Sequence, residues 1–353
     1  MLYYIVPSYI FFIYCLQIVF RDKNKFLFLL LPAIFFILII GVFRDITVGT
    51  DTHMYAFVFQ YPENIEIGYK FLAEFIKYFG GSFSFFLGLF FVFSFFLKLM
   101  SFKMTSNYFS LSLLTYSGFW FMTYDINGIR QGLALGFVIL AISFLNRENT
   151  KMFYFLLSLA IINHYSSVIV IPFAIIVNKI KCTNRLFLII FFSIALLAVS
   201  QFAQPIINFI SNFFGSDNHL ALKATSYSKD KLYNQNVLYS SRTLVRIFIL
   251  FITFFSLQKL KINDRLKNII LWSALLNISI YLIFSQFEII ATRLSLYYRF
   301  TECIFFSFLP ELTKNYLIKV LIGFVLLCYI LLQIFQVLSI ENNNLVPYKS
   351  ILF

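Results

Sequence analysis

Charged residues are scarce in this chain of 353 residues. Asp, Glu, Lys and Arg make up 12% of it, against about 25% in soluble globular proteins. A share this low excludes a soluble enzyme. Gly and Pro are also few, at 12 and 7 residues, which excludes a collagen-like chain and a disordered chain rich in these two residues.

Cysteines and the common nucleotide and metal motifs are few or absent as well. Three of the four cysteines lie in apolar runs, and the fourth, Cys182, lies in a short basic connection. We therefore predict no disulfide. The chain contains no Walker loop, no Gly-x-Gly-x-x-Gly, no His-Glu-x-x-His and no Cys-x-x-Cys. Because each of these motifs carries a specific cofactor chemistry, we predict a metal-independent site without a cofactor.

Long apolar runs fill most of the sequence instead. Hydrophobic residues make up 61% of it, Phe alone accounts for 50 residues, and the mean hydropathy is +0.86. Since about 20 helical residues cross a bilayer, we predict an all-α integral membrane protein, a multi-pass helical bundle of about 12 transmembrane segments. The whole chain, 1–353, is predicted to form a single polytopic membrane domain. The predicted segments are 1–20, 26–43, 83–97, 108–124, 129–145, 151–163, 166–178, 185–204, 244–257, 268–285, 294–310 and 317–338.

Two stretches leave the number of segments open. Residues 151–178 form either one long helix or two short ones, and the number of segments between 286 and 316 is also undecided. Basic residues flank 151–178 on both sides, which favours two short helices that return to the same side. Their junction, beginning at Asn163-His164, would then lie below the outer surface of the membrane.

Basic residues are concentrated in alternate connections between the predicted segments. One set of connections spans 48 residues and contains 16 Lys and Arg but four acids, whereas the other set contains 11 of each charge over a greater length. The basic set is 21–25, 98–107, 146–151, 178–185, 258–267 and 311–319. Because basic connections remain in the cytoplasm, we predict that this set is cytoplasmic and that both termini lie outside. Topology thus explains the formal net charge of +13, and we predict no nucleic-acid partner.

Two outer connections are long enough to build a site outside the membrane, namely 44–82 and 205–243. Loops held by a rigid scaffold often carry function. The first loop opens with a polar burst from Arg44 to Tyr55, in which Gly49 permits a tight turn. Asp51 or Thr50 is predicted to cap a helix on which Asp51 and Tyr55 share a face. The structural alternative is a simple helix cap with an Arg–Asp pair at the interface.

The same loop continues as an amphipathic helix. Ile65, Tyr69, Leu72, Ile76 and Phe79 recur at helical spacing, while Glu66, Lys70, Glu74 and Lys77 occupy the opposite side. This pattern predicts an interfacial helix along the outer surface of the membrane. Its lysines are most simply read as solvated partners of the glutamates.

Two further polar positions lie at the outer ends of predicted segments. Arg130, followed by Gln131, lies near a helix N-terminus, where a cation opposes the helix dipole and an anion would relieve the conflict. The alternative is that Arg130 reaches the interface or pairs with Asp125. His164 lies at the junction within 151–178, where it is either a structural hydrogen-bond donor or a proton acceptor or pyrophosphate contact.

The remaining candidates are arginines near the second large loop and the last outer segment. Arg242 and Arg246 are four residues apart, and Arg293, Tyr298 and Arg299 follow later in the chain. Arginines within a membrane are costly and usually mark a site or a buried pair. Arg246 has no acid nearby in the sequence and is therefore a strong candidate.

In their order, these motifs resemble the EpsG family, which is grouped with the Wzy-type O-antigen and exopolysaccharide polymerases. The resemblance covers most of the chain through short motifs. They are Arg44 with Val48-Gly49-Thr50-Asp51 and Tyr55, Glu66-Ile67-Gly68-Tyr69, Ile129-Arg130-Gln131, His164-Tyr165-Ser166-Ser167, the segment from Arg293 to Arg299, and Pro347-Tyr348-Lys349-Ser350.

The resemblance implies a GT-C-like glycosyltransferase of the bacterial inner membrane, with periplasmic loops and termini. Its substrate would be an oligosaccharide repeat unit linked to undecaprenyl pyrophosphate, and its partners would be the lipid bilayer, a chain-length regulator and a flippase. Displacing the pyrophosphate builds up negative charge that arginines can stabilise. Arg130, Arg246, Arg293 and Arg299 are the candidates for this role, and Arg44, Tyr55, Tyr69, Gln131, Arg242 and Tyr298 are further candidates for substrate binding. Asp51, Glu66 and His164 are alternative candidates for the base that activates the acceptor hydroxyl.

Other functions remain open on the sequence alone. A transporter or flippase of lipid-linked sugars would also use basic residues and a lipid groove, although charged residues through the core and internal repeats are typical of transporters. A membrane acyltransferase of surface glycans would use an intramembrane His. A structural subunit of a polysaccharide assembly is the third alternative.

Overall fold

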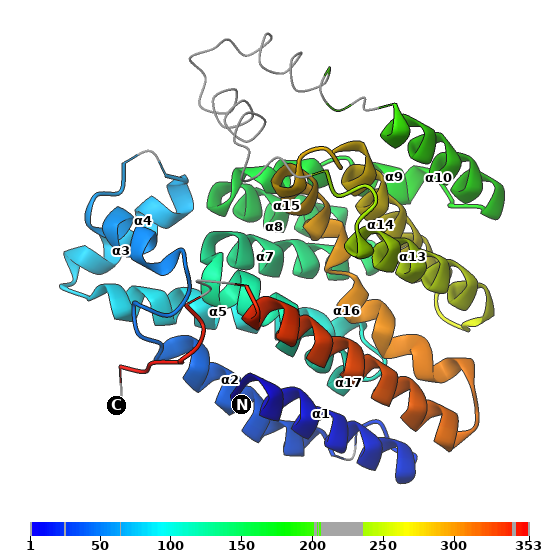
Figure 1. Ribbon diagram of the computed structural model, residues 1–353, viewed down its shortest axis with the longest axis horizontal. Coiled ribbons are helices and arrows are strands. Elements are labelled where there is room, and N and C mark those ends of the chain that lie inside the picture. Colours follow the sequence, from blue (N-terminus) through cyan, green and yellow to red (C-terminus); the bar gives the residue numbers. More distant parts are fainter. Residues whose placement is uncertain are drawn as a thin grey trace. The chain divides into compact units, whose positions relative to one another are not determined.

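The computed structural model describes residues 2–24, 26–63, 65–200, 203, 205, 236–340 and 344–351. Within these ranges every regular element is a helix (Figure 1), and the β pairing consists of a single isolated bridge between Arg44 and Ser350. The predicted all-α class is therefore confirmed. Most of the predicted outer loop 205–243 lies outside the described residues.

Contacts within the chain define two compact units, which we describe separately. The first unit comprises Met1–Ile171 and Glu302–Phe353, and the second comprises Pro172–Thr301. Helices of the first unit are α1 (Leu2–Val19), η1 (Leu27–Leu30), α2 (Leu31–Val42), α3 (Thr52–Gln60), α4 (Ile67–Tyr78), α5 (Phe83–Thr105), α6 (Phe109–Thr115), η2 (Tyr116–Asn127), α7 (Ile129–Asn146), α8 (Thr150–Asn163), η3 (Tyr165–Val170), α16 (Glu302–Phe305), η4 (Phe306–Leu312) and α17 (Tyr316–Leu338). Those of the second unit are α9 (Phe173–Lys179), α10 (Asn184–Val199), α13 (Ser241–Lys259), α14 (Asp264–Ile283) and α15 (Glu288–Arg299).

Six helices of the described chain are long and apolar enough to cross a membrane: α1, α5, α7, α13, α14 and α17. Shorter apolar helices cover Leu27–Val42, Thr150–Asn163, Tyr165–Lys179 and Asn184–Val199. The chain is therefore a multi-pass membrane protein by helix length and composition. The count of about 12 segments and the GT-C-like fold stay predictions. One reason is that the run 294–310 is divided among α15, α16 and η4.

The stretch 151–178 is interrupted at His164. The backbone there is extended, with φ −157° and ψ 111°, so α8 ends at Asn163 and a new helical turn begins at Tyr165. This break confirms the favoured interpretation, in which 151–178 forms two separate helices. At about 1.5 Å per residue, the 14 residues of α8 are too short to span a bilayer.

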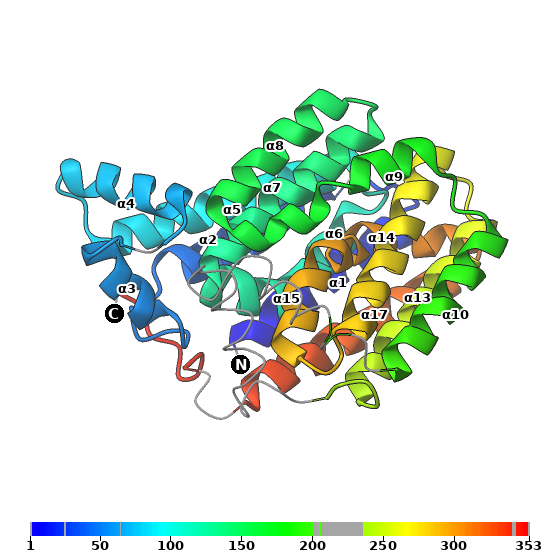
Figure 2. The same cartoon turned by 90° about the horizontal axis from the view of Figure 1, so that it is seen from above.

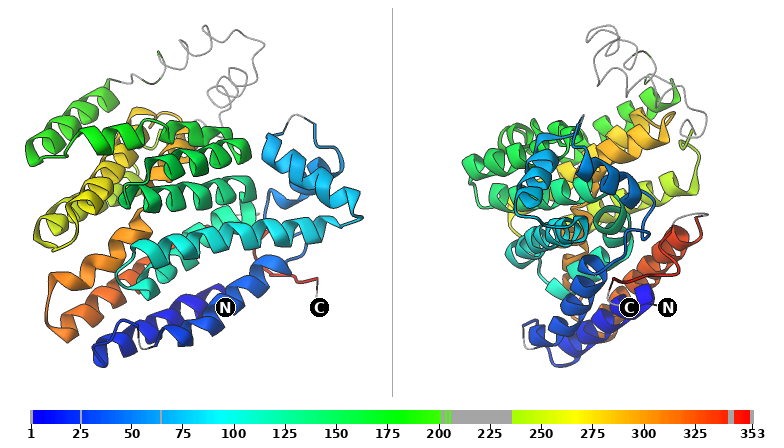
Figure 3. Two further views of the ribbon diagram at one scale, coloured as in Figure 1. Left: turned by 180° about the vertical axis from the view of Figure 1, so that it is seen from behind. Right: turned by 90° about the vertical axis from the view of Figure 1, so that its left-hand side faces the viewer.

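Close packing of α7 organises the first unit. α7 contacts both α5 and α8, and the three lie side by side (Figures 1 and 3). Gly132 permits α7 to approach η2, because a Cβ atom there would lie 2.3 Å from the carbonyl oxygen of Tyr124. This approach places the N-terminus of α7 beside the loop that contains α3 and α4.

The C-terminal tail is held against the start of the first loop. Asp45 N donates to Lys349 O at 3.0 Å, Ile351 N donates to Phe43 O at 2.9 Å, and the Tyr348 hydroxyl donates to Ile40 O at 2.9 Å. The Pro347-Tyr348-Lys349-Ser350 motif therefore fixes the backbone that follows α2.

Replacing Tyr348 with Phe is expected to lower the free energy of unfolding by about 1 kcal/mol, because the variant loses one hydrogen bond to a backbone carbonyl. Thermal unfolding in detergent measures the effect. Tyr78→Phe is the matched control, since Tyr78 is 85% exposed. Equal stability of the two variants would show that the Tyr348 bond does not hold the tail.

Aromatic contacts and hydrogen bonds from side chains to the backbone hold the second unit together. Phe187 of α10 stacks on Phe254 of α13 with ring centroids 4.2 Å apart, and both helices run beside α14 (Figure 2). The connection between α9 and α10 is held by Trp272, whose Nε1 donates to Ile180 O at 3.0 Å.

Candidate active site

Three polar side chains from distant segments meet in the first unit. Glu66 directly precedes α4, Arg130 is the second residue of α7, and His164 lies at the break between α8 and η3. Arg130 Nη1 donates to Glu66 Oε2, and His164 Nδ1 lies 3.0 Å from Glu66 Oε1. The carboxylate of Glu66 therefore contacts both Arg130 and His164, which were predicted as separate candidates.

The three side chains differ in their access to solvent. Glu66 is 4% exposed, whereas Arg130 is 23% exposed and His164 is 17% exposed. Gly68 permits this arrangement, because a Cβ atom there would lie 2.7 Å from Asn163 Oδ1 of α8. The carboxylate is thus an internal anchor, and the imidazole and guanidinium are the parts that a bound molecule can reach.

The burial of Glu66 corrects the predicted pattern of the amphipathic helix. α4 is a helix with Tyr69 and Ile76 buried and with Lys70 and Glu74 exposed as an ion pair, N to O 3.8 Å. Glu66, however, does not share the solvated side. It occupies the N-cap position, outside the helical repeat, and its backbone turns the carboxylate towards Arg130 and His164. Phe79 also differs from the prediction, since it follows the helix and is 70% exposed.

The pKa of Glu66 reflects these contacts. Burial alone would raise the pKa of its carboxyl, but the hydrogen bond with His164 and the positive charge of Arg130 outweigh burial and lower the pKa from 4.5 to about 2. Glu66 is therefore ionised at every physiological pH. An ionised carboxylate beside Nδ1 favours the imidazole tautomer that carries its proton there.

Glu66 is expected to contribute stability that depends on pH. Because its pKa is lower in the folded chain, the contribution is present above about pH 4.5 and is lost as the pH falls towards 2. The difference in unfolding free energy between the wild type and Glu66→Gln should shrink over this range, as measured by unfolding in detergent. Glu74→Gln, at an exposed position, is the control. A difference that stays constant down to pH 2 would contradict the assignment.

Two tyrosines support Arg130. The Arg130 guanidinium lies 5.3 Å from the centroid of the Tyr55 ring, in the geometry of a cation–π contact. The Tyr69 hydroxyl donates to Tyr55 O at 2.7 Å, and the Tyr69 ring has no exposed surface. Tyr69 was a candidate for substrate binding, but in this conformation it holds Tyr55 and cannot contact a substrate.

The polar burst at the start of the first loop lies beside the end of η2, just before α7. Asp51 N and the Thr50 hydroxyl both donate to Asn127 Oδ1, at 2.9 and 3.0 Å. Gly49 has φ 92°, as expected for a tight turn. Asp51 does occupy the N-cap position of α3, but its side chain makes no capping hydrogen bond, so this part of the prediction is wrong. The Asp51 carboxylate is half-buried.

A second polar cluster lies in the interior of the first unit. Lys98 Nζ lies 2.6 Å from Asp125 Oδ1, both side chains are 1% exposed, and Ser94 and Tyr116 also donate to this carboxylate. The alternative that pairs Asp125 with Arg130 is therefore wrong. Lys98 was not predicted as part of a site, because the sequence places it in a basic connection. A lysine at the end of an apolar run is nevertheless a signal of a buried pair or a site.

Arg44 is buried beneath the C-terminal tail. It is 1% exposed, and its Nη1 donates to Gly41 O at 2.8 Å, while Nε and Nη2 have no hydrogen-bond partner within the described ranges. Burial lowers the pKa of Arg44 to about 10, although the negative charge of Asp125 raises this pKa in part. In this conformation Arg44 cannot contact a substrate.

The other predicted arginines lie in the second unit. Arg246 Nη1 donates to Asn277 Oδ1 and Ser295 Oγ, both at 3.1 Å, and its guanidinium lies 3.7 Å from the Tyr281 ring centroid. Arg242 forms an ion pair with Glu288. Arg293, Tyr298 and Arg299 all lie on α15, where Arg293 is half-buried and the other two are buried.

Two remaining predictions concern Gln131 and a metal. Gln131 is 7% exposed beside Arg130 on α7. Among the described residues, no group of three or more His, Cys, Asp and Glu side chains could hold a metal ion.

The fold and the site define a multi-pass helical membrane protein with a partly open Glu–Arg–His site. The profile of the EpsG family matches residues 27–350, nearly the whole chain. The chain therefore belongs to the EpsG family, a family of Wzy-like polymerases, as its motifs predicted. Membership indicates a membrane polysaccharide polymerase of the glycosyltransferase type. Searches of curated proteins and of solved structures found no match.

Proposed function

We propose that this chain joins oligosaccharide repeat units linked to undecaprenyl pyrophosphate into O-antigen or exopolysaccharide on the periplasmic side of the inner membrane. The observation that supports the proposal most directly is the meeting of Glu66, Arg130 and His164 in a chain of the EpsG family. The contacts supply a base, an anchor for the base and a cation within one site.

His164 acts as the general base in this proposal. Glu66 accepts a hydrogen bond from the Nδ1–H group of His164, and Nε2 accepts the proton of the acceptor hydroxyl. The deprotonated oxygen then forms a bond to the anomeric carbon of the donor sugar. Glu66 is too buried and too acidic to be the base itself, so it positions His164. Asp51, which is half-buried beside Asn127 at the end of η2, is the alternative base.

Arg130 stabilises the leaving group. As the bond between the anomeric carbon and the pyrophosphate oxygen breaks, its electron pair remains on the pyrophosphate, and an arginine can stabilise that charge. Glu66 and Tyr55 hold the Arg130 guanidinium, which leaves part of it for the substrate. In the second unit, Arg246, Arg293 and Arg299 are proposed to bind phosphate as well. We propose that the charge of Arg130 makes a metal unnecessary at the site of the first unit.

The test uses purified protein in detergent with lipid-linked repeat units, and the products are sized. Longer glycans on the same carrier support polymerisation. Acylated units would establish an acyltransferase instead, and unchanged units would leave transport or a structural role. Adding a chelator tests metal independence, because a metal-dependent enzyme would lose activity.

The periplasmic side of the site rests on the distribution of charge. Lys98, counted within a cytoplasmic connection, lies within α5 and is buried, but the other connections of that set remain strongly basic. Reporter fusions at the connection 146–151 should therefore report the cytoplasm, and fusions at 60–63 should report the periplasm. In the cell, a flippase and a chain-length regulator are the expected partners.

A further inference from the structure

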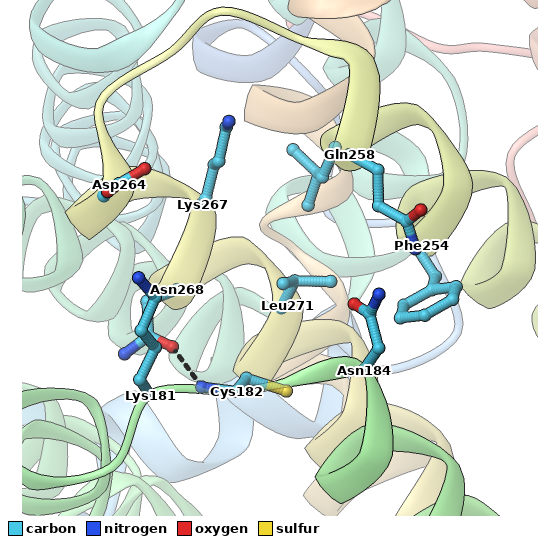
Figure 4. Close-up of a pocket in the computed structure, with 10 residues that line it drawn as sticks. Lys181, Cys182, Asn184, Phe254, Gln258, Asp264, Lys267, Asn268 and Leu271 are labelled. Atoms are coloured by element: carbon cyan, nitrogen blue, oxygen red, sulfur yellow. Dashed lines mark hydrogen bonds between the residues drawn. The ribbon is translucent and has the colours of Figure 1, made fainter.

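A cavity of about 170 Å³ lies within the second unit, between the ends of α10, α13 and α14 (Figure 4). Its polar lining includes Lys181, Asn184, Gln258, Asp264, Lys267 and Asn268. These residues lie in the second unit, whereas Glu66, Arg130 and His164 lie in the first. The proposed function assigns no role to them.

The cavity lies in the most basic part of the second unit. The connections 178–185 and 258–267 together contain seven Lys and Arg residues and one acid, Asp264. Neither Lys181 nor Lys267 forms an ion pair in the part of the chain that the structure describes. The cavity therefore has an excess of positive charge that its own residues do not neutralise.

The wall of the cavity is held in place by hydrogen bonds. Asn268 accepts from Cys182 N at 2.8 Å and donates to Val177 O at 2.9 Å and to Ile180 O at 3.1 Å. These bonds attach the segment around Lys181 to α14. These hydrogen bonds therefore fix the backbone on both sides of Lys181 at the rim of the cavity.

Apolar surface continues from the charged rim. Phe254, Leu257 and Leu271 line the cavity beneath the polar residues. On α10, Leu188 and Phe192 follow Asn184 at intervals of four residues, so they share its face, and they are 40% and 60% exposed. A ligand that fits this surface has an anionic head and an apolar tail.

We propose that this cavity binds the phosphate-bearing headgroup of an anionic phospholipid, with its acyl chains along Leu188 and Phe192. Basic pockets at the ends of membrane helices attract anionic headgroups, and the attraction falls off within a Debye length. Lys181 and Lys267 contact the phosphate, and Asn184 and Gln258 donate hydrogen bonds to it. The proposal does not depend on the catalytic role of the first unit.

Native mass spectrometry of the full chain in detergent tests the proposal. The protein is titrated with cardiolipin, whose headgroup carries two phosphates, with zwitterionic phosphatidylethanolamine, and with inorganic pyrophosphate. We expect cardiolipin to bind at least about tenfold more tightly than either of the others, because only cardiolipin combines the charge with acyl chains. Pyrophosphate binding as tight as that of cardiolipin would overturn the lipid assignment in favour of a soluble anion.

Matched variants locate the binding to the cavity. Lys181→Gln with Lys267→Gln should weaken cardiolipin binding about tenfold. Lys259→Gln with Lys261→Gln removes the same charge from one of these two connections, 258–267, but outside the cavity lining, and should change binding less than about twofold. Equal losses in both pairs would show diffuse attraction and overturn the proposal.

A third variant should increase the affinity. Asp264→Asn removes the single carboxylate from the rim, so cardiolipin should bind several-fold more tightly. A misfolded protein would not show such a gain. Unchanged or weaker binding by Asp264→Asn would contradict a phosphate beside this residue.

Discussion

Replacing His164 with Asn should lower the rate of polymer formation by about 10² to 10⁴-fold, the usual contribution of a general base. Asn can still donate a hydrogen bond to Glu66, so the anchor and the break after α8 are preserved, but it cannot accept a proton. The measurement is the initial rate of polymer formation with lipid-linked repeat units.

His53→Asn is the matched control for this experiment, because His53 is exposed on α3. It should retain the wild-type rate. Full activity of His164→Asn would exclude His164 as the base, and Asp51→Asn would then become the informative variant.

Breaking the contact between Glu66 and Arg130 should separate stability from activity. Removing one partner of a buried ion pair costs about 3–5 kcal/mol. Because Arg130 is 23% exposed, we expect Arg130→Ala to lower the unfolding free energy by about 2 kcal/mol, with solvent compensating in part. The double variant Glu66→Ala with Arg130→Ala removes both charges, so its loss should be smaller than the sum of the two single losses.

Polymerase activity should not show the same non-additivity as the unfolding free energy. All three variants should lack polymerase activity, because each lacks the cation, the anchor of the base, or both. Lys70→Ala with Glu74→Ala removes an exposed pair of the same loop and should change neither property appreciably. Strictly additive losses of stability would show that Glu66 and Arg130 do not interact in the folded protein.

The helices could be located from the sequence because hydrophobic runs in this chain are long and are interrupted by polar residues. α7 and α17 follow the predicted runs within a residue or two. The end of α5 was missed by eight residues, since a lysine was taken to end the run and the helix continues to Thr105. Lys98 is tolerated there only because Asp125 neutralises it, and that partner is far away in the sequence.

The residues of the candidate site could be predicted from the sequence, but the contacts among them could not. Glu66, Arg130 and His164 each stood out as polar positions at helix ends. Their contacts join residues 64 and 98 positions apart, and no periodic pattern encodes such pairings. The burial of Tyr69 and Arg44 likewise could not be predicted from the sequence, because both residue types occur at surfaces as well as in cores.

The buried pair between Lys98 and Asp125 has a consequence for biogenesis. During synthesis, α5 emerges before η2, and a lone ammonium group within a nascent membrane helix costs about 3 kcal/mol. Partition of α5 into lipid is therefore more favourable once Asp125 has been synthesised, so the two segments should integrate most completely together, as a hairpin. A nascent chain halted before Tyr116 should integrate α5 less completely than one extended beyond Asn127.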